Sequence, residues 1–271
     1  MQKTILLLAA AACAALTASA QDWARQAVDK SPRHREWVTV KHDGRNVEAY
    51  VAYPERKDKA PVVLVIHEIF GHSDWVEEVT DEFAAAGYIA ISPDLLSGMG
   101  PNGGGTKSFG SGGVGQAIGK LPPDQITADL NAAADYALHL PAASGKLFVA
   151  GFCYGGSQTF RYATNRPDLS GAFVFYGTPP MKDSMPEKTE LARIKAPVYG
   201  FFGENDNRVD SQIAPTIEAM KALGKTYEPV TYAGAGHGFM RSGEQPDAAE
   251  ANHKAREEAW VRLKALLKQH S

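Results

Sequence analysis

The sequence predicts an α/β fold with a mostly parallel, doubly wound sheet and an antiparallel hairpin at its N-terminal edge. Short, continuous apolar runs such as PVVLVIH at 61–67 are typical of strands that are buried on both faces. Segments with helical spacing alternate with these runs, and that order favours parallel strands joined by crossover helices. The 271 residues contain no internal repeat and no linker that would divide two domains.

The first twenty residues have the pattern of a secretory signal peptide. Lys3 supplies a positive charge, residues 5–16 are apolar, and the small residues 18–20 form a cleavage site. The apolar stretch is too short to span a membrane, and no later stretch reaches the roughly 18 apolar residues that a spanning helix needs. We therefore expect a periplasmic or secreted protein whose single domain comprises residues 21–271.

The net charge and the cysteine content exclude some classes of binding partner and an internal disulfide. The net charge of −3 is too small to predict binding to nucleic acid or to a membrane surface. Cys13 lies in the leader, and a lipoprotein site there is the less favoured alternative because alanines precede it. Without the leader, Cys153 is the one remaining cysteine, so no internal disulfide can form.

The remaining elements follow from local patterns. Residues 36–42 and 47–54 alternate apolar and polar side chains around Asp43-Gly44, which predicts the hairpin. Residues 73–86 have helical spacing and end at Gly87, a typical helix C-cap. The same reasoning predicts further strands at 88–92, 146–151, 171–176, 197–202 and 226–232, and further helices at 123–138, 155–165, 210–223 and 246–268.

Residues 97–119 contain ten glycines and show no periodicity. A segment of this length is too long to be a simple turn. Long glycine-rich loops either are disordered or act as lids over a binding site, and the composition leaves both alternatives open.

Cys153 lies in the stretch GFCYG at 151–155, between a predicted strand and a predicted helix. This pattern fits the G-x-S-x-G nucleophile elbow with cysteine in place of serine. The elbow is so sharp that flanking side chains would collide with the neighbouring strand and helix, which explains the glycines. The N-terminus of the following helix favours a thiolate. A buried, inert cysteine is the alternative interpretation.

A cysteine nucleophile needs a base, and His237 is the best placed of the eight histidines because it follows the last predicted strand. The loop after residue 202 offers Glu204, Asp206 and Asp210 as carboxylates that could orient the imidazole. We expect Asp210 to cap the next helix, whereas Asp206 lies in mid-loop. The order Cys153, Asp206, His237 is the nucleophile–acid–base order of the α/β-hydrolase fold.

The segment HEIFGH at 67–72 follows the first buried strand. A zinc-protease motif requires H-E-x-x-H on a helix, and here the second histidine is one residue too far, so we expect no metal site. The segment fits an oxyanion loop instead, in which the backbone N–H groups of Ile69 and Tyr154 face the developing negative oxygen. Glu68 would lie near the thiol, where it either accepts the thiol proton or repels the thiolate.

Four segments together resemble the dienelactone hydrolase family, also called carboxymethylenebutenolidases. They are HEIFG at 67–71, PDLL at 93–96, GFCYGG at 151–156 and GHGFMR at 236–241. The resemblance extends over roughly residues 47–267. It implies an α/β-hydrolase fold, a triad of Cys153, Asp206 and His237, a carboxylate near the thiol at Glu68, and oxyanion N–H groups from Ile69 and Tyr154.

The chain departs from the family pattern near the substrate. The family holds the carboxylate of dienelactone with two arginines, one of which matches Arg241. Gly98 stands where the other arginine would be, and Gly238 replaces a serine after the histidine. The loop before Asp206 has one extra residue. The triad survives these departures, but hydrolysis of dienelactone itself does not follow from the resemblance.

The sequence therefore predicts an exported hydrolase of esters or lactones that acts through a thioester on Cys153. Its substrate would be a small molecule, and Arg241 would favour an anionic one. We expect no cofactor, nucleic-acid partner, membrane partner or obligate protein partner. Two alternatives stay open: a catalytically weak or inactive ligand-binding protein on the same scaffold, and a redox-sensing thiol that pairs between molecules.

Overall fold

The computed structural model describes residues 21–110 and 112–271. The predicted signal peptide at 1–20, with Cys13, lies outside the described residues. The described chain begins with a helix that the sequence did not predict, α1 (Asp22–Lys30), which packs against α2 (Asp74–Ala85). No helix in the described ranges has both the length and the apolar composition needed to cross a membrane.

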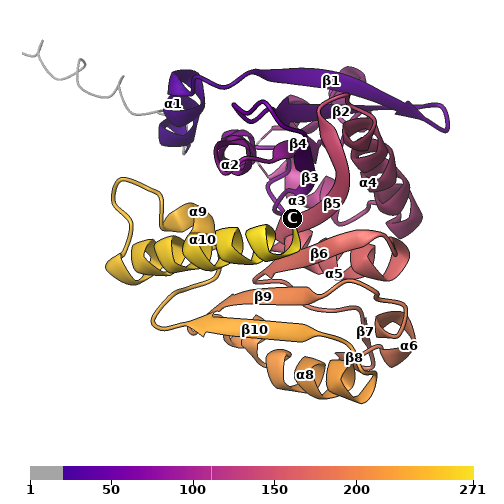
Figure 1. Ribbon diagram of the computed structural model, residues 1–271, viewed down its shortest axis with the longest axis vertical. Helices are drawn as coiled ribbons and strands as arrows, with labels where there is room; N and C mark the ends of the chain where they lie inside the picture. Colours follow the sequence, from indigo (N-terminus) through magenta and orange to yellow (C-terminus); the bar gives the residue numbers. More distant parts are fainter. Residues whose placement is uncertain (1–20, 111) are drawn as a thin grey trace, which may run out of the picture.

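The main sheet has eight strands in the order β1-β2-β4-β3-β5-β6-β9-β10 across the described residues (Figure 1). Strands β1 and β2 form the predicted hairpin and β2 pairs antiparallel with β4, whereas all other neighbouring pairs are parallel. The predicted α/β fold with an antiparallel N-terminal edge is therefore confirmed. The strands are β1 (Arg35–His42), β2 (Arg45–Ala52), β3 (Ala60–Ile66), β4 (Ile89–Pro93), β5 (Ala143–Phe152), β6 (Leu169–Phe175), β9 (Val198–Gly203) and β10 (Tyr227–Tyr232).

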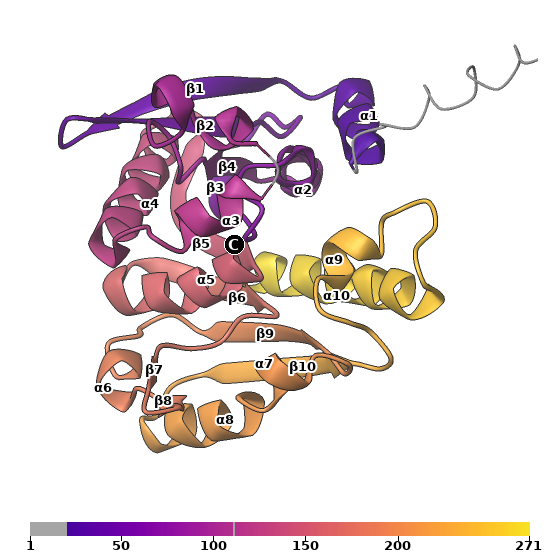
Figure 2. The same ribbon diagram turned by 180° about the vertical axis from the view of Figure 1, so that it is seen from behind.

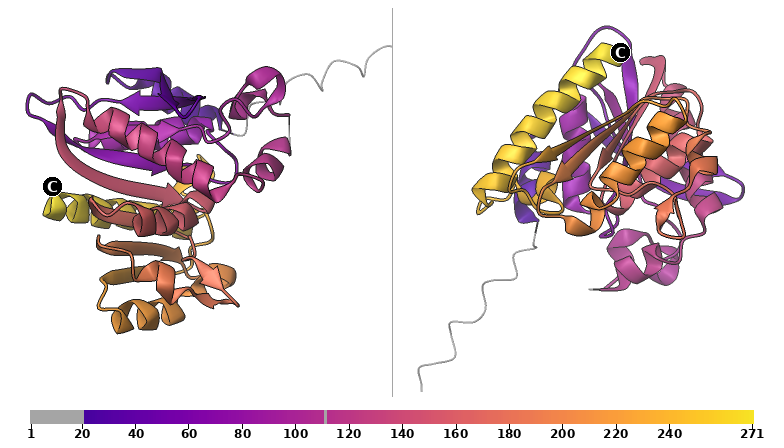
Figure 3. Two further views of the ribbon diagram at one scale, coloured as in Figure 1. Left: turned by 90° about the vertical axis from the view of Figure 1, so that its right-hand side faces the viewer. Right: turned by 90° about the horizontal axis from the view of Figure 1, so that it is seen from below.

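Helices cover both faces of the sheet (Figures 2 and 3). On one face, α2 and α10 contribute Trp75, Phe83 and Trp260 to a core that is rich in aromatic side chains. On the other face, α4, α5 and α8 enclose a second core of mainly aliphatic side chains. All of β3 is buried between the two cores, which explains its unbroken apolar run. The helices are α4 (Pro123–Leu138), α5 (Tyr154–Asn165), α8 (Ile213–Ala222) and α10 (Glu250–His270).

The glycine-rich segment 97–119 is folded, with residue 111 outside the description. It forms the 3-10 turns η1 (Pro101–Gly103) and η2 (Thr106–Ser108) and the helix α3 (Gly113–Ile118). Thr106 fixes the segment, because its N–H and its hydroxyl both donate to the carboxylate of Asp94 at 2.7 Å. The N–H of His72 in turn donates to the Thr106 hydroxyl at 3.0 Å. The segment therefore packs beside the predicted oxyanion loop.

Short elements account for most differences from the predicted elements. Local patterns did not predict β7 (Met181–Lys182), β8 (Met185–Pro186), α6 (Lys188–Leu191) and α9 (Phe239–Ser242).

The predicted helix at 210–223 is divided into α7 (Asn207–Asp210) and α8. Asp210 therefore ends one helix instead of capping the next, and this expectation was wrong. Asp206 occupies the N-cap position of α7. The final helix begins at Glu250, a few residues after the predicted start.

Candidate active site

Cys153 occupies the turn between β5 and α5. Its backbone has φ 56° and ψ −113°, a strained conformation for a residue with a side chain. The turn is held on both sides. The N–H of Cys153 donates to the carbonyl of Phe175 at 3.0 Å, and its carbonyl accepts from the N–H of Ser157 at 3.2 Å. The partly exposed Cys153 therefore lies at the carboxyl edge of the sheet on a rigid turn.

Close backbone approach explains the glycines around the turn. A Cβ on Gly151 would lie 2.1 Å from the carbonyl oxygen of Gly155, and a Cβ on Gly155 would lie 2.1 Å from that of Ile66. Both distances are far below van der Waals contact, so neither position accepts a side chain unless the backbone moves. The glycines therefore avoid the clash that the elbow pattern predicts. Their lack of side chains lets the start of α5 pack against the end of β3.

His237 lies in the loop after β10 and interacts with both other members of the predicted triad. Its Nδ1 donates a hydrogen bond to Oδ2 of Asp206, and Cys153 is close enough to influence the pKa of the ring. Burial lowers the pKa of His237, but the hydrogen bonds and charges of Cys153 and Asp206 outweigh burial and raise the pKa to about 9. An imidazole with this pKa holds a proton at neutral pH, which stabilises a neighbouring thiolate.

The loops that carry Asp206 and His237 are tied to each other. The Glu204 carboxylate accepts from the N–H of Gly234 at 2.8 Å, and the N–H of Asn205 donates to the carbonyl of Ala235 at 2.8 Å. Glu204 thus holds the histidine loop, and Asp206, which is 7% exposed, is the carboxylate that reaches the imidazole.

The predicted oxyanion donors come from adjacent segments. A Cβ on Gly155, next to Tyr154, would lie 2.6 Å from the carbonyl oxygen of His67, so the start of α5 touches the loop that carries Ile69. Within the described residues, neither the N–H of Ile69 nor that of Tyr154 has an acceptor. Two unpaired N–H groups near the predicted nucleophile would have the chemistry of an oxyanion hole. Their role stays a prediction.

Glu68 and Arg241 form a buried ion pair. Nε of Arg241 donates to Oε2 of Glu68 at 2.7 Å, and the side chains are 21% and 3% exposed, respectively. Burial raises the pKa of Glu68, although the charges of Arg241 and His237 oppose this. The guanidinium also lies over the exposed ring of Phe70, 5.0 Å from its centroid. The predicted substrate-binding arginine is therefore already engaged, and an anionic substrate must compete with Glu68 for it.

One of the two glycines that depart from the family pattern lies beside this ion pair. A Cβ on Gly238 would lie 3.8 Å from Nη2 of Arg241 and 3.9 Å from Oε1 of Glu68. A Cβ on Gly98 would meet no heavy atom within 4 Å in the described structure. Close packing requires neither glycine, but both have positive φ, 76° at Gly238 and 74° at Gly98, which favours glycine.

The sequence reasoning missed Tyr176, which follows β6 with φ 40°. Burial raises the pKa of its hydroxyl well above the usual value, and the negative charges of Glu68 and Cys153 raise it further. Carboxyl ends of parallel strands share one edge of a sheet, so a polar residue directly after β6 was a usable signal.

The two histidines of HEIFGH do not converge on a common point. Nδ1 of His67 bonds the carbonyl of Glu68 at 2.8 Å, and Nε2 of His72 pairs with the hydroxyl of Ser92 at 2.8 Å. Burial lowers the pKa of both rings, that of His72 to about 4. These histidines are neutral structural groups that hold the loop around Glu68.

A group of three carboxylates lies elsewhere on α2 and before α10. The ligand atoms of Glu78, Glu82 and Glu244 lie within 4.8 Å of one another in the described chain. Arg256 contacts Glu82 at 2.7 Å and Glu244 at 2.8 Å, so a cation is already present in this group.

Comparison with protein families assigns the chain to a known family. The family model of the dienelactone hydrolase family matches residues 47–271. A candidate carboxymethylenebutenolidase of Escherichia coli strain K12 is 30% identical over 242 residues, which cover 86% of this chain and 86% of that protein. A similarly named protein of Synechocystis is 30% identical over 244 residues and covers 84% of this chain and 94% of its own length.

Solved structures agree with this result. A candidate dienelactone hydrolase from Klebsiella pneumoniae superposes with a TM-score of 0.75 at 26% identity, covering 88% of this chain and 100% of the other. A dienelactone hydrolase-like promiscuous phosphotriesterase from metagenomic libraries superposes with a TM-score of 0.73 at 20% identity, covering 88% and 98%. The second likeness is one of fold alone.

Proposed function

The chain belongs to the dienelactone hydrolase family, and we propose that it is an exported hydrolase of esters or lactones with Cys153 as nucleophile. One observation carries the proposal: the imidazole of His237 donates to Asp206 and has its pKa raised by Cys153, which lies on a strained turn at the carboxyl edge of the sheet. This geometry has the parts of a nucleophile, a base and an orienting acid.

The reaction begins from a Cys153 thiolate beside a His237 imidazolium, because the imidazole holds its proton at neutral pH. In the first half, the thiolate sulfur attacks the substrate carbonyl carbon. The N–H groups of Ile69 and Tyr154 hold the resulting oxyanion. The tetrahedral intermediate collapses, the bond from carbon to the ester oxygen breaks, and the imidazolium gives its proton to the departing oxygen. The products of this half are a thioester on Cys153 and a free alcohol.

In the second half, His237 takes a proton from water while the water oxygen attacks the thioester carbon. The carbon–sulfur bond breaks, the acid is released, and the thiolate and the imidazolium of the resting enzyme are restored. Because a thiolate leaves more easily than an amide nitrogen, collapse back to substrate competes when the other leaving group is poor. The chemistry therefore favours activated esters and lactones over amides.

The Glu68–Arg241 pair gives this mechanism a preference for anionic substrates. A substrate carboxylate that bonds Arg241 replaces Glu68 as its partner. The released Glu68 is buried and has a raised pKa, so it is able to accept a proton beside the thiol. With Gly238 beside the pair, the acid group of the substrate has more room than a side chain at that position would leave.

Replacement of the nucleophile tests the proposal. We expect Cys153→Ala to abolish hydrolysis of p-nitrophenyl acetate and of a small-lactone panel, and the wild type to accumulate a thioester that mass spectrometry detects after acid quenching. Ser211→Ala, at an exposed position, is the matched control and should keep full activity. Equal rates of hydrolysis for Cys153→Ala and wild type would show that Cys153 is not the nucleophile. If the wild type hydrolyses none of these substrates and iodoacetamide labels Cys153 slowly, the ligand-binding alternative is favoured.

Export is tested separately. Expression of the full chain in a Gram-negative host should deliver a periplasmic protein whose N-terminal residue is Gln21, as read by mass spectrometry. A protein that stays in the cytoplasm with residues 1–20 attached would contradict export without affecting the hydrolase proposal.

A further inference from the structure

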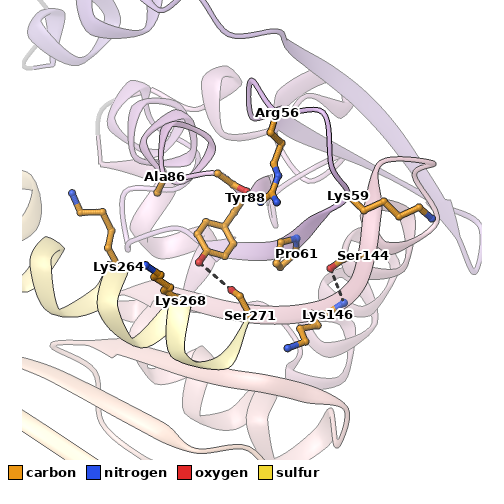
Figure 4. Close-up of a pocket in the computed structure, with 11 residues that line it drawn as sticks. Arg56, Lys59, Pro61, Ala86, Tyr88, Ser144, Lys146, Lys264, Lys268 and Ser271 are labelled. Atoms are coloured by element: carbon orange, nitrogen blue, oxygen red, sulfur yellow. Dashed lines mark hydrogen bonds between the residues drawn. The ribbon is translucent and has the colours of Figure 1, made fainter.

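A cavity of about 570 Å³ lies at the end of the sheet opposite the nucleophile (Figure 4). Five cationic side chains line it: Arg56, Lys59, Lys146, Lys264 and Lys268. They come from the loop before β3, the start of β5 and the last turns of α10. Its volume lies within the roughly 300–1,000 Å³ that is typical of small-ligand sites.

The cavity concentrates positive charge in a chain with a net charge of −3. No acidic side chain lines it. In the described structure none of the five cations forms an ion pair. Partly buried arginines elsewhere, such as Arg33 and Arg256, do form ion pairs with carboxylates. Lys264 and Lys268 are one helical turn apart on α10, where like charges repel each other. A group of cations without acidic partners favours an anionic ligand.

Two of the cations are held in position by the protein. Nη1 of Arg56 donates to the carbonyl of Gly87 at 3.1 Å, which leaves other N–H groups of the guanidinium without a partner in the described residues. Nζ of Lys146 donates to the carbonyl of His270 at 2.9 Å. Figure 4 shows the Arg56 side chain beside Tyr88, whose hydroxyl pairs with that of Ser271 at 3.1 Å. The floor of the cavity therefore offers fixed donors as well as charge.

We propose that this cavity binds a small anion that carries two or more phosphate groups. Five positive charges line this small cavity. Molecules with two or more phosphate groups carry several negative charges in a similarly small volume, so their charge density matches that of the cavity. Arginine and lysine recognise phosphate oxygens by charge-assisted hydrogen bonds. All five cationic residues are exposed, so a ligand in solution can reach them.

The site is separate from the proposed hydrolytic site. Lys146 lies at the start of β5 and Cys153 follows its end, so at about 3.3 Å per residue the two are on the order of 20 Å apart. The inference therefore does not rest on the proposed function, and variants of the cavity are expected to keep esterase activity.

Titration of the mature chain with tripolyphosphate, pyrophosphate and acetate at low ionic strength tests the proposal. We expect saturable binding of the two polyphosphates, no competition by acetate, and loss of about tenfold or more in affinity for Lys264→Gln/Lys268→Gln. Lys254→Gln is the matched control, because it removes a lysine of the same helix outside the cavity. The double variant should unfold at the same temperature as wild type or at a higher one, since it removes a repulsion.

Vesicles distinguish a soluble phosphate from a lipid headgroup. Co-sedimentation with phosphatidylcholine vesicles that contain cardiolipin, whose headgroup carries two phosphates, would assign the phosphates to a headgroup if tripolyphosphate competes and the double variant loses binding. Binding of tripolyphosphate without vesicle binding would assign it to a free molecule. The proposal is overturned by no binding in either experiment, or by equal affinity losses in Lys254→Gln and the double variant.

Discussion

The aromatic ring of Tyr176 packs edge-on against the imidazole of His237, with ring centroids 5.0 Å apart and planes inclined by 64°. Tyr176 is 1% exposed, and its hydroxyl has no hydrogen-bond partner among the described residues. Leaving a buried hydroxyl unpaired costs stability, and so does a tyrosine backbone with positive φ. Both features occur directly beside the predicted base, so we expect the Tyr176 hydroxyl to take part in binding the substrate.

We therefore expect Tyr176→Phe to keep the stability of the wild type and to lower kcat/KM by about tenfold, the loss of roughly one hydrogen bond in the transition state. The phenyl ring keeps its packing against His237, so thermal unfolding should be unchanged or shifted upward. Tyr176→Ala, in contrast, should cost about 3–5 kcal/mol of stability because it opens a cavity. Unchanged kinetics in Tyr176→Phe would assign this residue to packing alone.

The pKa of His237 predicts how the rate depends on pH and on the leaving group. With a pKa of about 9, the imidazolium is present at neutral pH and donates its proton to the departing oxygen. As the pH rises through 9 this proton is lost, so kcat/KM for a methyl ester should fall. For p-nitrophenyl acetate the fall should be much smaller, because p-nitrophenolate leaves without a proton.

Asp206→Asn provides the control for that profile. It removes one of the two negative charges that raise the pKa of His237, so the descending limb for the methyl ester should move to lower pH. The assignment of His237 as general acid would be contradicted if the rates for the two esters fell equally with rising pH. It would also be contradicted if the descending limb of the pH–rate profile stayed at the same pH in Asp206→Asn.

The ion pair between Glu68 and Arg241 predicts a strong asymmetry between its single variants. Arg241→Ala leaves a buried carboxylate without its cation, and we expect a loss on the order of 3 kcal/mol in the free energy of unfolding. Glu68→Gln keeps a hydrogen-bond acceptor for Nε and leaves the partly exposed arginine charged, so its loss should be smaller. Denaturant unfolding of both variants and of the double variant measures the coupling, and a coupling near zero would mean that the pair does not form.

Gly155 at the elbow should not tolerate alanine. Its Cβ would lie 2.1 Å from the carbonyl oxygen of Ile66, so backbone must move and the free energy of unfolding should fall by about 3 kcal/mol or more. Gly110→Ala is the matched control, because its Cβ would meet nothing within 4 Å and should leave stability almost unchanged. A stable, active Gly155→Ala protein would show that α5 does not pack this closely against β3.

Glu82 predicts a loss of stability as the pH rises. Burial raises its pKa to about 7, although Arg256 opposes this. A raised pKa in the folded state means that the stabilising contribution is complete below the unfolded pKa, roughly 4.3, and is lost as the pH rises through 7. The melting temperature of the wild type should therefore fall between pH 5 and pH 8, and Glu82→Gln, which cannot ionise, should fall less. Parallel curves for the two proteins would contradict this assignment.

Much of the fold follows from local sequence, because a buried parallel strand must be apolar along its whole length and a crossover helix must be apolar on one stripe. Helix α4 has the predicted bounds for this reason. Elements of two to four residues, such as β7 and α9, carry too few side chains for any periodicity, and only contacts with the rest of the chain stabilise them. Asp210 was misassigned because α7 and α8 read as one helix when only residue types are considered.

By itself, the sequence determined the strand and helix order and the candidate residues Cys153, Asp206 and His237, because elbow glycines and loops after strands leave local patterns. Only the tertiary structure decided that Arg241 is bonded to Glu68 across 173 positions, that the Tyr176 hydroxyl has no described partner, and that five cations surround one cavity. These relationships depend on which segments lie side by side in space. No spacing along the chain records them, since each residue is ordinary until its neighbours are placed.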